Sequence, residues 1–584
     1  MRIPKDIHLV CQWLLPLCCI VFGLLSGQVG LVALAQEQAP AKSTAVVTKL
    51  EIYPDQIQLA DSRSEAQFII IGKTAAGETV DLTSEATFTA DPPANLQIKG
   101  GFVLPGGNGA GKVAISARGL TAEVPYSVAG HGVDRPVWFR REMLSALTRQ
   151  GCNMGACHGS PSGKGGFRLS LRAFDPELDK LTLIREDLGR RTNLLQPEKS
   201  LLLAKPLMQV AHGGGQKILK TDYTYTIMVD WISAGCPVPE EAQEASCVKL
   251  EVSPPSGQVM RRPDWTQQVA VIAHFSDGTK RDVSRLASLS SSDEEVAAIS
   301  PEGKVIGKGR GEAAIIARYM DQVQTCELTF IEDVPNYVWN SPSPANYVDQ
   351  LVYTKLQKLS YLPSPICSDE EFVRRIYLDV IGVLPSPAEA EAFIADKSPD
   401  KRLKLINQLL ERPEFAKFWA LKWGDLLRLT SAQIGPEALF KYNRWLEESF
   451  SQNLPYDQFV AQLITATGST LENLAANFYR TATETNDCVE TVSQVFMGSR
   501  LQCAKCHNHP FERWTQDNYF GMAAFFNRVQ RKKMPRADAF LVYMNRSGEV
   551  TQPRTGKITP PGCRMWVLLP MRKGRIAVWS LPNG

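Results

Sequence analysis

The sequence predicts a multidomain fold in which two all-β sandwiches alternate with a small helical module and a larger all-α domain. Short apolar segments separated by Gly, Pro, Asn and Asp turns fill residues 46–130 and 247–332, a texture typical of sandwiches. An apolar helical face opens residues 135–240, and helix-start signals recur through residues 344–531. The chain therefore predicts four folded units in the order β, α, β, α.

The composition is that of an ordinary globular protein. The chain has 584 residues, of which 44% are hydrophobic and 21% charged, so it is long enough for several cores. Its 64 basic and 61 acidic residues give a net charge of +3, without the basic stripe that nucleic-acid binding needs. We therefore expect no nucleic acid among the partners.

Residues 1–35 predict an export signal. Arg2 and Lys5 precede a long apolar run, and the small residues in Ala33–Ala35 suit cleavage after position 35. Because the run is longer than most signal peptides, the alternative is an uncleaved membrane anchor. A polar linker, residues 36–45, follows. In either case we expect the body of the chain outside the cytoplasm, in the periplasm, at the cell surface or secreted.

The two sandwich segments repeat one module. Residues 49–54 (KLEIYP) match residues 249–254 (KLEVSP), and residues 111–118 (GKVAISAR) match residues 311–318 (GEAAIIAR). Self-similarity at a fixed spacing is the signature of a duplicated structural unit. Both segments are therefore expected to share one strand arrangement.

The second copy, through HFSDGTKRDVSRL and SPEGKVIGKGRGEAAIIARY, resembles the bacterial immunoglobulin-like domain of group 2, and the first copy does so more weakly. This resemblance implies modules that space or bind rather than catalyse. Cys247 and Cys326 are candidates for a disulfide within the second copy, because the strands that carry them are neighbours in such sandwiches.

The small helical module contains a Cys-Cys-His motif. Cys152, Cys157 and His158 form C-x-x-x-x-C-H directly after the predicted helix. A loop of this length can present two sulfurs to the vinyl groups of a porphyrin and an imidazole to its iron. The three residues are therefore candidates for a haem c site. The alternative is a disulfide between Cys152 and Cys157, with His158 an ordinary surface residue.

The larger helical domain ends in the most specific motif of the chain. The SDEE and SPAE segments at residues 368–371 and 386–389 have helix-start spacing. Cys503, Cys506 and His507 then form C-x-x-C-H, the attachment pattern of haem c. Zinc or another metal is the alternative cofactor at this motif.

The sixth ligand of an iron at His507 is less well specified. Met522 and Met497 are candidate distal ligands, although each also suits core packing. His509 is too close to His507 in sequence to reach the opposite face of the same iron easily, so it is a candidate for a secondary role. Without a distal ligand, the iron would be five-coordinate and open to a small ligand or to redox catalysis.

The segments NYVDQLVYTKL, EEFVRRIYLDVIGVLPSPAEAEAFI and QCAKCHNHPFERWTQDNYFGMAAFF resemble the second planctomycete cytochrome c-like domain over nearly its whole length. Residues 135–240, through SLLLAKPLMQVAHGGG, resemble the first cytochrome-type module of that family. The family loop usually carries a Met, whereas this sequence places His212 before three glycines. The resemblance implies His158 as proximal ligand and His212 as distal ligand, with Met208 as the alternative. The other interpretation is that His212 is a turn residue held by its own backbone. A bis-histidine iron transfers electrons rather than binding substrate.

Residues 532–584 predict an irregular tail. From Cys563 onward the sequence shows neither the alternation of a strand nor the apolar face of a helix. Codons can be chosen for this segment so that translation in a shifted reading frame gives a sequence that resembles the family's next domain. Our hypothesis is that a frameshift or truncation ends the chain there.

Three functions fit these observations. The leading hypothesis is an exported c-type haem protein that transfers electrons to an unidentified redox partner, with haem at Cys503, Cys506 and His507 and a second site in the small module. A surface adhesion or carbohydrate-binding protein with structural Cys-His motifs, recognising an extracellular polymer, is the second. The third is a metal-dependent hydrolase with zinc at the C-terminal Cys/His cluster.

Overall fold

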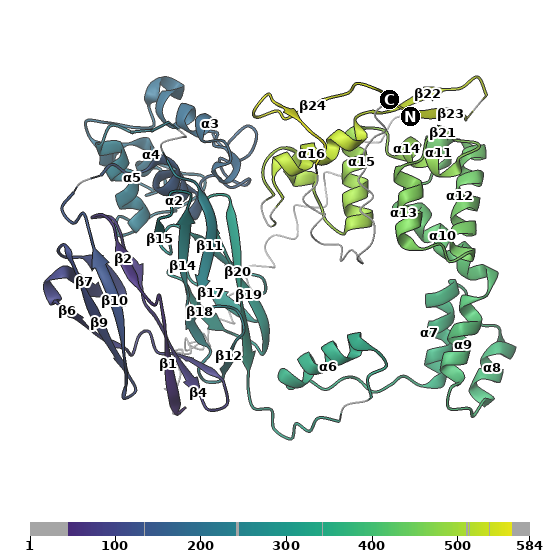
Figure 1. Ribbon diagram of the computed structural model, residues 1–584, viewed down its shortest axis with the longest axis horizontal. Coiled ribbons are helices and arrows are strands. Elements are labelled where there is room, and N and C mark those ends of the chain that lie inside the picture. The colour runs from purple at the N-terminus through teal and green to yellow at the C-terminus, as the bar shows by residue number, and fades with distance from the viewer. Residues whose placement is uncertain are drawn as a thin grey trace, which may run out of the picture.

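The computed structural model describes residues 45–562, apart from residues 134, 241–243, 341–342, 510–511, 513 and 537. Its N-terminal part is rich in β-strands and its C-terminal part is helical, which confirms a multidomain chain of mixed architecture (Figure 1). The expected export signal and the possible frame change after Cys563 lie outside the described residues. Among the described residues, no helix is long and apolar enough to cross a membrane.

The first β-rich unit forms three sheets, with strand orders β1-β4-β5, β2-β10-β9-β6 and β3-β8-β7. Along β10, inward-facing Val124, Tyr126 and Val128 are buried and their neighbours are exposed, the two-residue period of a half-buried strand. The strands are β1 (Val47–Tyr53), β2 (Ile57–Leu59), β3 (Ala66–Gln67), β4 (Ile69–Thr74), β5 (Thr79–Asp81), β6 (Thr87–Asp91), β7 (Leu96–Lys99), β8 (Phe102–Pro105), β9 (Gly109–Ala117) and β10 (Leu120–Val128).

The second β-rich unit has the same sheet orders, β11-β14-β15, β12-β20-β19-β16 and β13-β18-β17. In each unit the last strand pairs in parallel with the second and antiparallel with the ninth. This agrees with the sequence repeat. The strands are β11 (Cys247–Ser253), β12 (Gln258–Arg261), β13 (Thr266–Gln268), β14 (Ala270–Phe275), β15 (Lys280–Asp282), β16 (Ser288–Ser291), β17 (Ala297–Ile299), β18 (Lys304–Gly307), β19 (Gly311–Tyr319) and β20 (Gln322–Ile331).

The two β-rich units contact each other through equivalent residues. The backbone N–H of Gln67 donates to Asp282 at 2.7 Å, and the backbone N–H of Gln268 donates to Asp81 at 2.6 Å. The contact is therefore reciprocal, like the interface of a symmetric dimer. A duplicated module has in effect dimerised within one chain.

The middle module, residues 135–240, lies between the two β-rich units in the sequence. It consists of short helices and long loops. A helical turn at Phe139–Leu144 continues into α2 (Ser145–Arg149). The predicted apolar face is confirmed, because Phe139, Met143, Leu144 and Leu147 are all buried. The remaining helices are α3 (Pro176–Lys180), α4 (Leu201–Ala204) and α5 (Tyr223–Ser233).

The middle module shares one hydrophobic core with the second β-rich unit. Within the module, Phe139 stacks on Trp231 with ring centroids 5.7 Å apart. At the junction, the Tyr319 hydroxyl donates to the carbonyl oxygen of Arg141 at 2.7 Å. The motif at residues 152–158 therefore rests on a rigid base rather than on a tethered domain.

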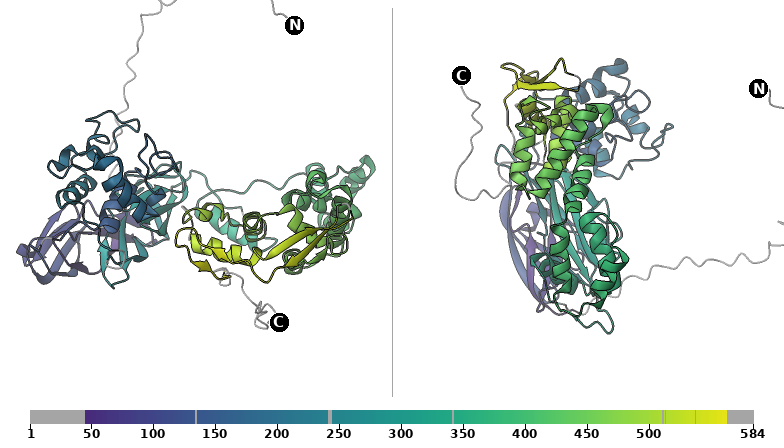
Figure 2. Two further views of the ribbon diagram at one scale, coloured as in Figure 1. Left: turned by 90° about the horizontal axis from the view of Figure 1, so that it is seen from above. Right: turned by 90° about the vertical axis from the view of Figure 1, so that its right-hand side faces the viewer.

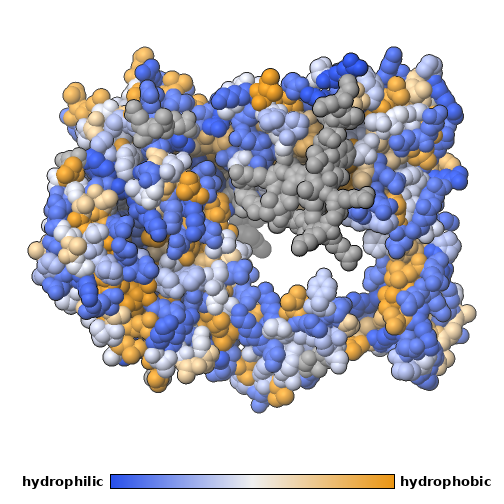
Figure 3. All heavy atoms as spheres, viewed as in Figure 1, coloured by the Kyte–Doolittle hydropathy of each residue, from blue (hydrophilic) through white to orange (hydrophobic). Residues whose placement is uncertain are grey.

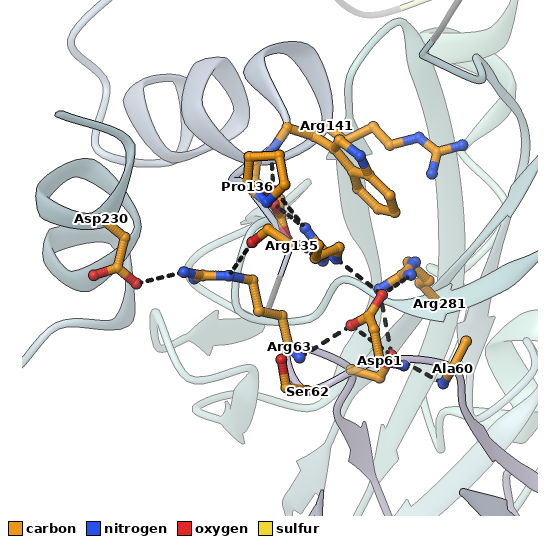
Figure 4. A network of polar contacts seen from close by, with 12 residues as sticks. Ala60, Asp61, Ser62, Arg63, Arg135, Pro136, Arg141, Asp230 and Arg281 are labelled. Atoms are coloured by element: carbon orange, nitrogen blue, oxygen red, sulfur yellow. Dashed lines mark hydrogen bonds and ion pairs between the residues drawn. The ribbon is translucent and has the colours of Figure 1, made fainter. Parts of the chain in front are cut away.

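A network of ion pairs joins the middle module to both β-rich units (Figure 4). Arg135 lies 2.9 Å from Asp61, which also pairs with Arg281 of the second unit. Arg63 of the first unit reaches Asp230 on α5 at 2.8 Å. Because Asp61, Arg135 and Arg281 are largely removed from water, their ion pairs fix the relative positions of the three units.

The C-terminal helices form two core clusters. The Ser368 hydroxyl caps the Glu371 N–H, and Ser386 with Glu389 forms a full capping box, as predicted. The helices are α6 (Tyr347–Lys358), α7 (Asp369–Ile381), α8 (Pro387–Ala395), α9 (Lys401–Leu410), α10 (Pro413–Leu426), α11 (Ser431–Ile434), α12 (Pro436–Ser451), α13 (Tyr456–Ile464), α14 (Phe478–Thr481), α15 (Thr485–Thr491) and α16 (Gln516–Phe526). On the viewed face, polar and apolar side chains are intermixed over these helices (Figure 3).

Two expectations are corrected by the structure. The tail is not irregular up to residue 562, because β22 (Val529–Lys533) and β23 (Phe540–Met544) form a sheet with β21 (Gly468–Ser469), and β24 (Val550–Thr551) pairs with β25 (Ile558–Thr559). The disulfide between Cys247 and Cys326 is also absent. Both are buried free thiols that point to different carbonyl groups, those of Lys249 and Pro254.

Candidate functional site

The first Cys-Cys-His motif forms a tight loop at the end of α2. The His158 N–H donates to the carbonyl of Cys152 at 3.0 Å and closes the loop. Cys152 and Cys157 are both partly exposed free thiols, so the alternative disulfide is not formed. Burial in the surrounding protein raises the pKa of Cys152 to about 12. The residue after the motif must be glycine, because a Cβ on Gly159 would lie 2.1 Å from the Asn153 carbonyl oxygen.

The ring of His158 is held in one orientation. Its Nδ1 lies 2.9 Å from the carbonyl oxygen of Phe167. A carbonyl only accepts, so Nδ1 donates the proton, and neutral His158 carries its lone pair on Nε2. Burial, followed by the nearby charge of His212, lowers the pKa of His158 and so favours this neutral form.

The ring of His212 lies beside the ring of His158. The two ring centroids are 6.3 Å apart and the ring planes are inclined by 18°. His212 Nδ1 is 2.7 Å from the carbonyl oxygen of Gly215, which leaves Nε2 of this ring as the metal-binding atom as well. A Cβ on Gly214 would approach the ring to 3.0 Å, so glycine at this position makes room for the imidazole.

The separation of the two rings is compatible with a bis-histidine haem. Imidazoles bound through nitrogen to opposite faces of one metal ion have ring centroids about 6 Å apart. Metal-binding histidines also typically donate their second nitrogen to a carbonyl, as both rings do here. The alternative distal ligand, Met208, has an exposed side chain. The module also exposes several large apolar side chains: Leu181, Leu188, Leu194, Leu195, Val210 and Leu219.

The second motif lies in a short helical turn, Gln502–Lys505, that precedes α16. Cys503 and Cys506 are exposed free thiols, accessible to a vinyl group. His507 Nδ1 lies 2.7 Å from the carbonyl oxygen of Asn508, so Nε2 is again the atom that suits a metal. These residues also fit haem c.

The other residues considered for the second motif have separate surroundings. His509 Nδ1 accepts a hydrogen bond from the Glu512 N–H at 3.0 Å, and burial lowers the pKa of the ring. Met522 is buried within the core of the helical domain, and Met497 packs against the same core. Both methionines therefore occupy packing positions, and a distal ligand to His507 stays a prediction.

Within the described residues, no three His, Cys, Asp or Glu side chains are close enough together to hold one metal ion. Cys503, Cys506, His507 and His509 are all described, so they do not converge on a common point in this conformation. Zinc needs such convergence of four ligands, whereas haem c needs two spaced sulfurs and a single histidine at the iron.

The C-terminal helical domain is similar to PSCyt2. Residues 347–531 match this family, which is described as a protein of unknown function (DUF1549). The match covers the second Cys-Cys-His motif and begins three residues from the predicted boundary at 344. The predicted resemblance of this domain to the PSCyt2 family is thus confirmed. The resemblances of the other segments stay predictions.

Other comparisons are weak. No curated protein matches the chain. Domains 4–9 of the surface layer protein SbsC align over 51% of this chain and 33% of that one, with 9% identity and a TM-score of 0.21. Domains 5–6 of the S-layer protein SbsC align over 49% of this chain and 98% of that one, with 9% identity and a TM-score of 0.20. The chain thus spans a third of the first of these structures.

The PSCyt2-like domain returns to contact the middle module, which the sequence did not predict. Phe174, in the loop before α3, meets the His507 ring edge-on with centroids 6.5 Å apart. The Arg554 guanidinium lies 5.4 Å from the centre of the same Phe174 ring. Figures 1 and 2 show α16 and the β24 hairpin on the side of the domain that faces the middle module. The middle module therefore contacts the second motif directly through Phe174.

Proposed function

We propose that this chain is an exported c-type cytochrome that holds two haem groups and passes electrons between them. The observation that carries this proposal is the pair His158 and His212, which lie at the ring separation that two axial ligands need, each with Nδ1 directed at a carbonyl. Haem bound at each motif would supply a one-electron redox centre.

The chain's own residues have distinct roles in this proposal. His158 and His212 would close both faces of one iron, which suits electron transfer without substrate binding. At the second motif, Cys503 and Cys506 would anchor the porphyrin and His507 would bind its iron. The two β-rich units would act as immunoglobulin-like spacers outside the cytoplasm.

A short connection between the motifs supports transfer between the two centres. The Arg172 N–H donates to the carbonyl of Asn153, inside the first motif, at 3.1 Å. Phe174 follows two residues later and contacts His507. This loop therefore links one motif to the proximal histidine of the other through a hydrogen bond, a few residues of backbone and one aromatic ring.

The proposal is tested by haem content. The full chain is produced with export and haem-attachment machinery, and a Soret band with a pyridine haemochrome should give two haems per chain. Cys503→Ala and Cys157→Ala should each remove one haem, while Cys367→Ala, outside both motifs, should remove none. A colourless protein would overturn the proposal, and stoichiometric zinc in that protein would favour the hydrolase hypothesis instead.

A further inference from the structure

Arg191 is a buried arginine in a loop of the middle module, outside both Cys-Cys-His motifs. Only 7% of its surface is exposed, although arginine is rarely buried without partners. Its guanidinium donates to the carbonyl oxygen of Thr182 and to the carboxylate of Asp187, both at 2.7 Å. Its backbone carbonyl accepts from the Leu202 N–H at 3.1 Å. The side chain and the backbone of Arg191 are therefore each fixed by a different segment.

The guanidinium of Arg191 also covers the ring of Phe167, with its central carbon 4.6 Å from the ring centre. Arginine is suited to this double role, because its planar group stacks on an aromatic face while its edges donate hydrogen bonds. The same group can therefore hold Phe167 and remain anchored on Thr182 and Asp187.

Phe167 in turn contacts His158 in two ways. The two ring centroids are 4.6 Å apart, with the ring planes inclined by 47°. The Phe167 carbonyl oxygen is also the partner of His158 Nδ1, at 2.9 Å. One residue thus limits where the imidazole plane lies and which ring nitrogen carries the proton.

The segment that carries Phe167 gives it little rigidity of its own. Gly163, Gly165 and Gly166 precede it, all with positive φ, from 62° to 75°. Glycine allows many backbone conformations, so this turn does not by itself hold the next residue in place. Phe167 packs partly against the shared core, and Arg191 covers its ring from another segment. The support for Phe167 therefore comes from outside its own loop.

We propose that Arg191 is a positioning residue for His158. It acts through Phe167, which it holds so that the imidazole keeps its proton on Nδ1 and stays inclined by only 18° to the ring of His212. This role does not depend on a cofactor. With haem at the first motif, which rests on the proposed function above, the same contacts would also set the angle between two axial imidazole planes and so tune the metal.

The first test uses the haem-free full chain with ¹⁵N-labelled histidine. At about pH 8.5 histidine is neutral, and the nitrogen chemical shifts of its ring distinguish the two tautomers. The signals of His158 are those that disappear in His158→Gln. Arg191→Gln should raise the share of the Nε2-protonated tautomer about threefold or more, because the carbonyl partner of Nδ1 is no longer held in place.

A second variant and a control accompany Arg191→Gln. Asp187→Asn removes the charge that anchors the guanidinium, and it should fold because Asp187 is exposed and asparagine tolerates its φ of 52°. It should shift the tautomer ratio in the same direction by a smaller factor, and it decides the test if Arg191→Gln does not fold. The matched control is Arg190→Gln, at the exposed arginine next to Arg191, which should leave the ratio unchanged.

The second test uses the haem-loaded chain. Arg191→Gln should keep two haems per chain but change the low-spin electron paramagnetic resonance spectrum of one of them, because that spectrum responds to the angle between axial imidazole planes.

The outcomes separate the positioning role from the haem proposal. A changed tautomer ratio in a chain that stays colourless when produced with haem-attachment machinery supports the positioning role and overturns the haem proposal. A tautomer ratio that stays at the wild-type value in the folded variants overturns the positioning role, whatever the haem content. A change of equal size in Arg190→Gln also overturns it.

Discussion

The ring centroids of His158 and His212 lie 6.3 Å apart, although the two residues belong to different loops of the middle module. Each ring is oriented by a carbonyl group of its own loop, that of Phe167 for one and Gly215 for the other. The pair is therefore preorganised by local backbone contacts before any cofactor binds. Preorganisation of this kind is what a metal site uses to fix ligand geometry.

This pairing predicts the effect of His212→Ala. Removing the distal imidazole should open one coordination position, so the reduced variant should bind one more carbon monoxide per chain than the wild type. Absorbance titration with carbon monoxide measures this. His274→Ala, a histidine on β14 that pairs with Glu251, is the control and should leave the stoichiometry unchanged. Equal binding by His212→Ala and wild type would mean that His212 is not a ligand.

Sequence reasoning singled out His158 and His212 but did not predict what surrounds them. His212 was noticed because it stands in a loop where the resembling family usually has a methionine. The repeat was noticed because matching strand residues recur at a fixed spacing. The contact between Phe174 of the middle module and His507 of the second motif was missed. Arg172, Arg318 and Arg554, which line one cleft at this contact, come from three separate parts of the chain. Such long-range docking leaves no local periodicity or motif.

The incorrect disulfide has a similar cause. Cys247 and Cys326 do lie on strands of one sandwich, as expected. Strand assignment alone does not set which way each side chain faces, and a disulfide needs both Cβ atoms within about 4 Å. In the structure, register places Cys326 opposite Ile315 and Cys247 opposite Phe275.

Thiol reactivity should distinguish the motif cysteines from the buried ones. Burial raises the pKa of Cys247, Cys326 and Cys488 to about 12, whereas Cys503 and Cys506 are exposed. In the folded haem-free chain, a maleimide should therefore label Cys503 and Cys506 roughly 100-fold faster than the other three. Peptide mass spectrometry measures the labelling.

The same labelling reports haem attachment. In the haem-loaded chain, Cys503 and Cys506 should be thioethers and should resist maleimide even in guanidinium chloride, where the buried thiols become reactive. Rapid labelling of Cys503 in the haem-loaded protein would contradict covalent attachment there.

The shared core predicts that the middle module and the second β-rich unit unfold together. Phe139 is 1% exposed and stacks on Trp231, so Phe139→Ala should cost about 3–5 kcal/mol. Scanning calorimetry should show one transition for both units shifting to lower temperature. Phe440→Ala on α12, where the side chain is 71% exposed, should change stability by less than about 0.5 kcal/mol. A shift confined to the haem absorbance would contradict a common core.

The ion pairs of Asp61 predict how stability depends on pH. Burial alone would raise the pKa of Asp61, but hydrogen bonds and charges from Arg281 and Arg135 outweigh burial and hold it well below its usual range. A carboxyl whose pKa is lower in the folded state contributes stability that is fully present above its unfolded pKa of about 3.9. That contribution is lost as the pH falls from there through the folded pKa.

Asp61→Asn should therefore destabilise the protein by about 3 kcal/mol at pH 7, because it leaves two buried guanidinium groups without their carboxylate. Below about pH 4 the wild type loses the stability that ionised Asp61 contributes. The free energy of unfolding of Asp61→Asn should therefore fall less steeply than that of the wild type in this range. Urea unfolding between pH 7 and pH 2.5 measures both effects. Asp55→Asn, at an exposed position in the same β-rich unit, should follow the wild-type curve. If Asp61→Asn and wild type lose stability in parallel as the pH falls, then Asp61 does not hold the three units together through its charge.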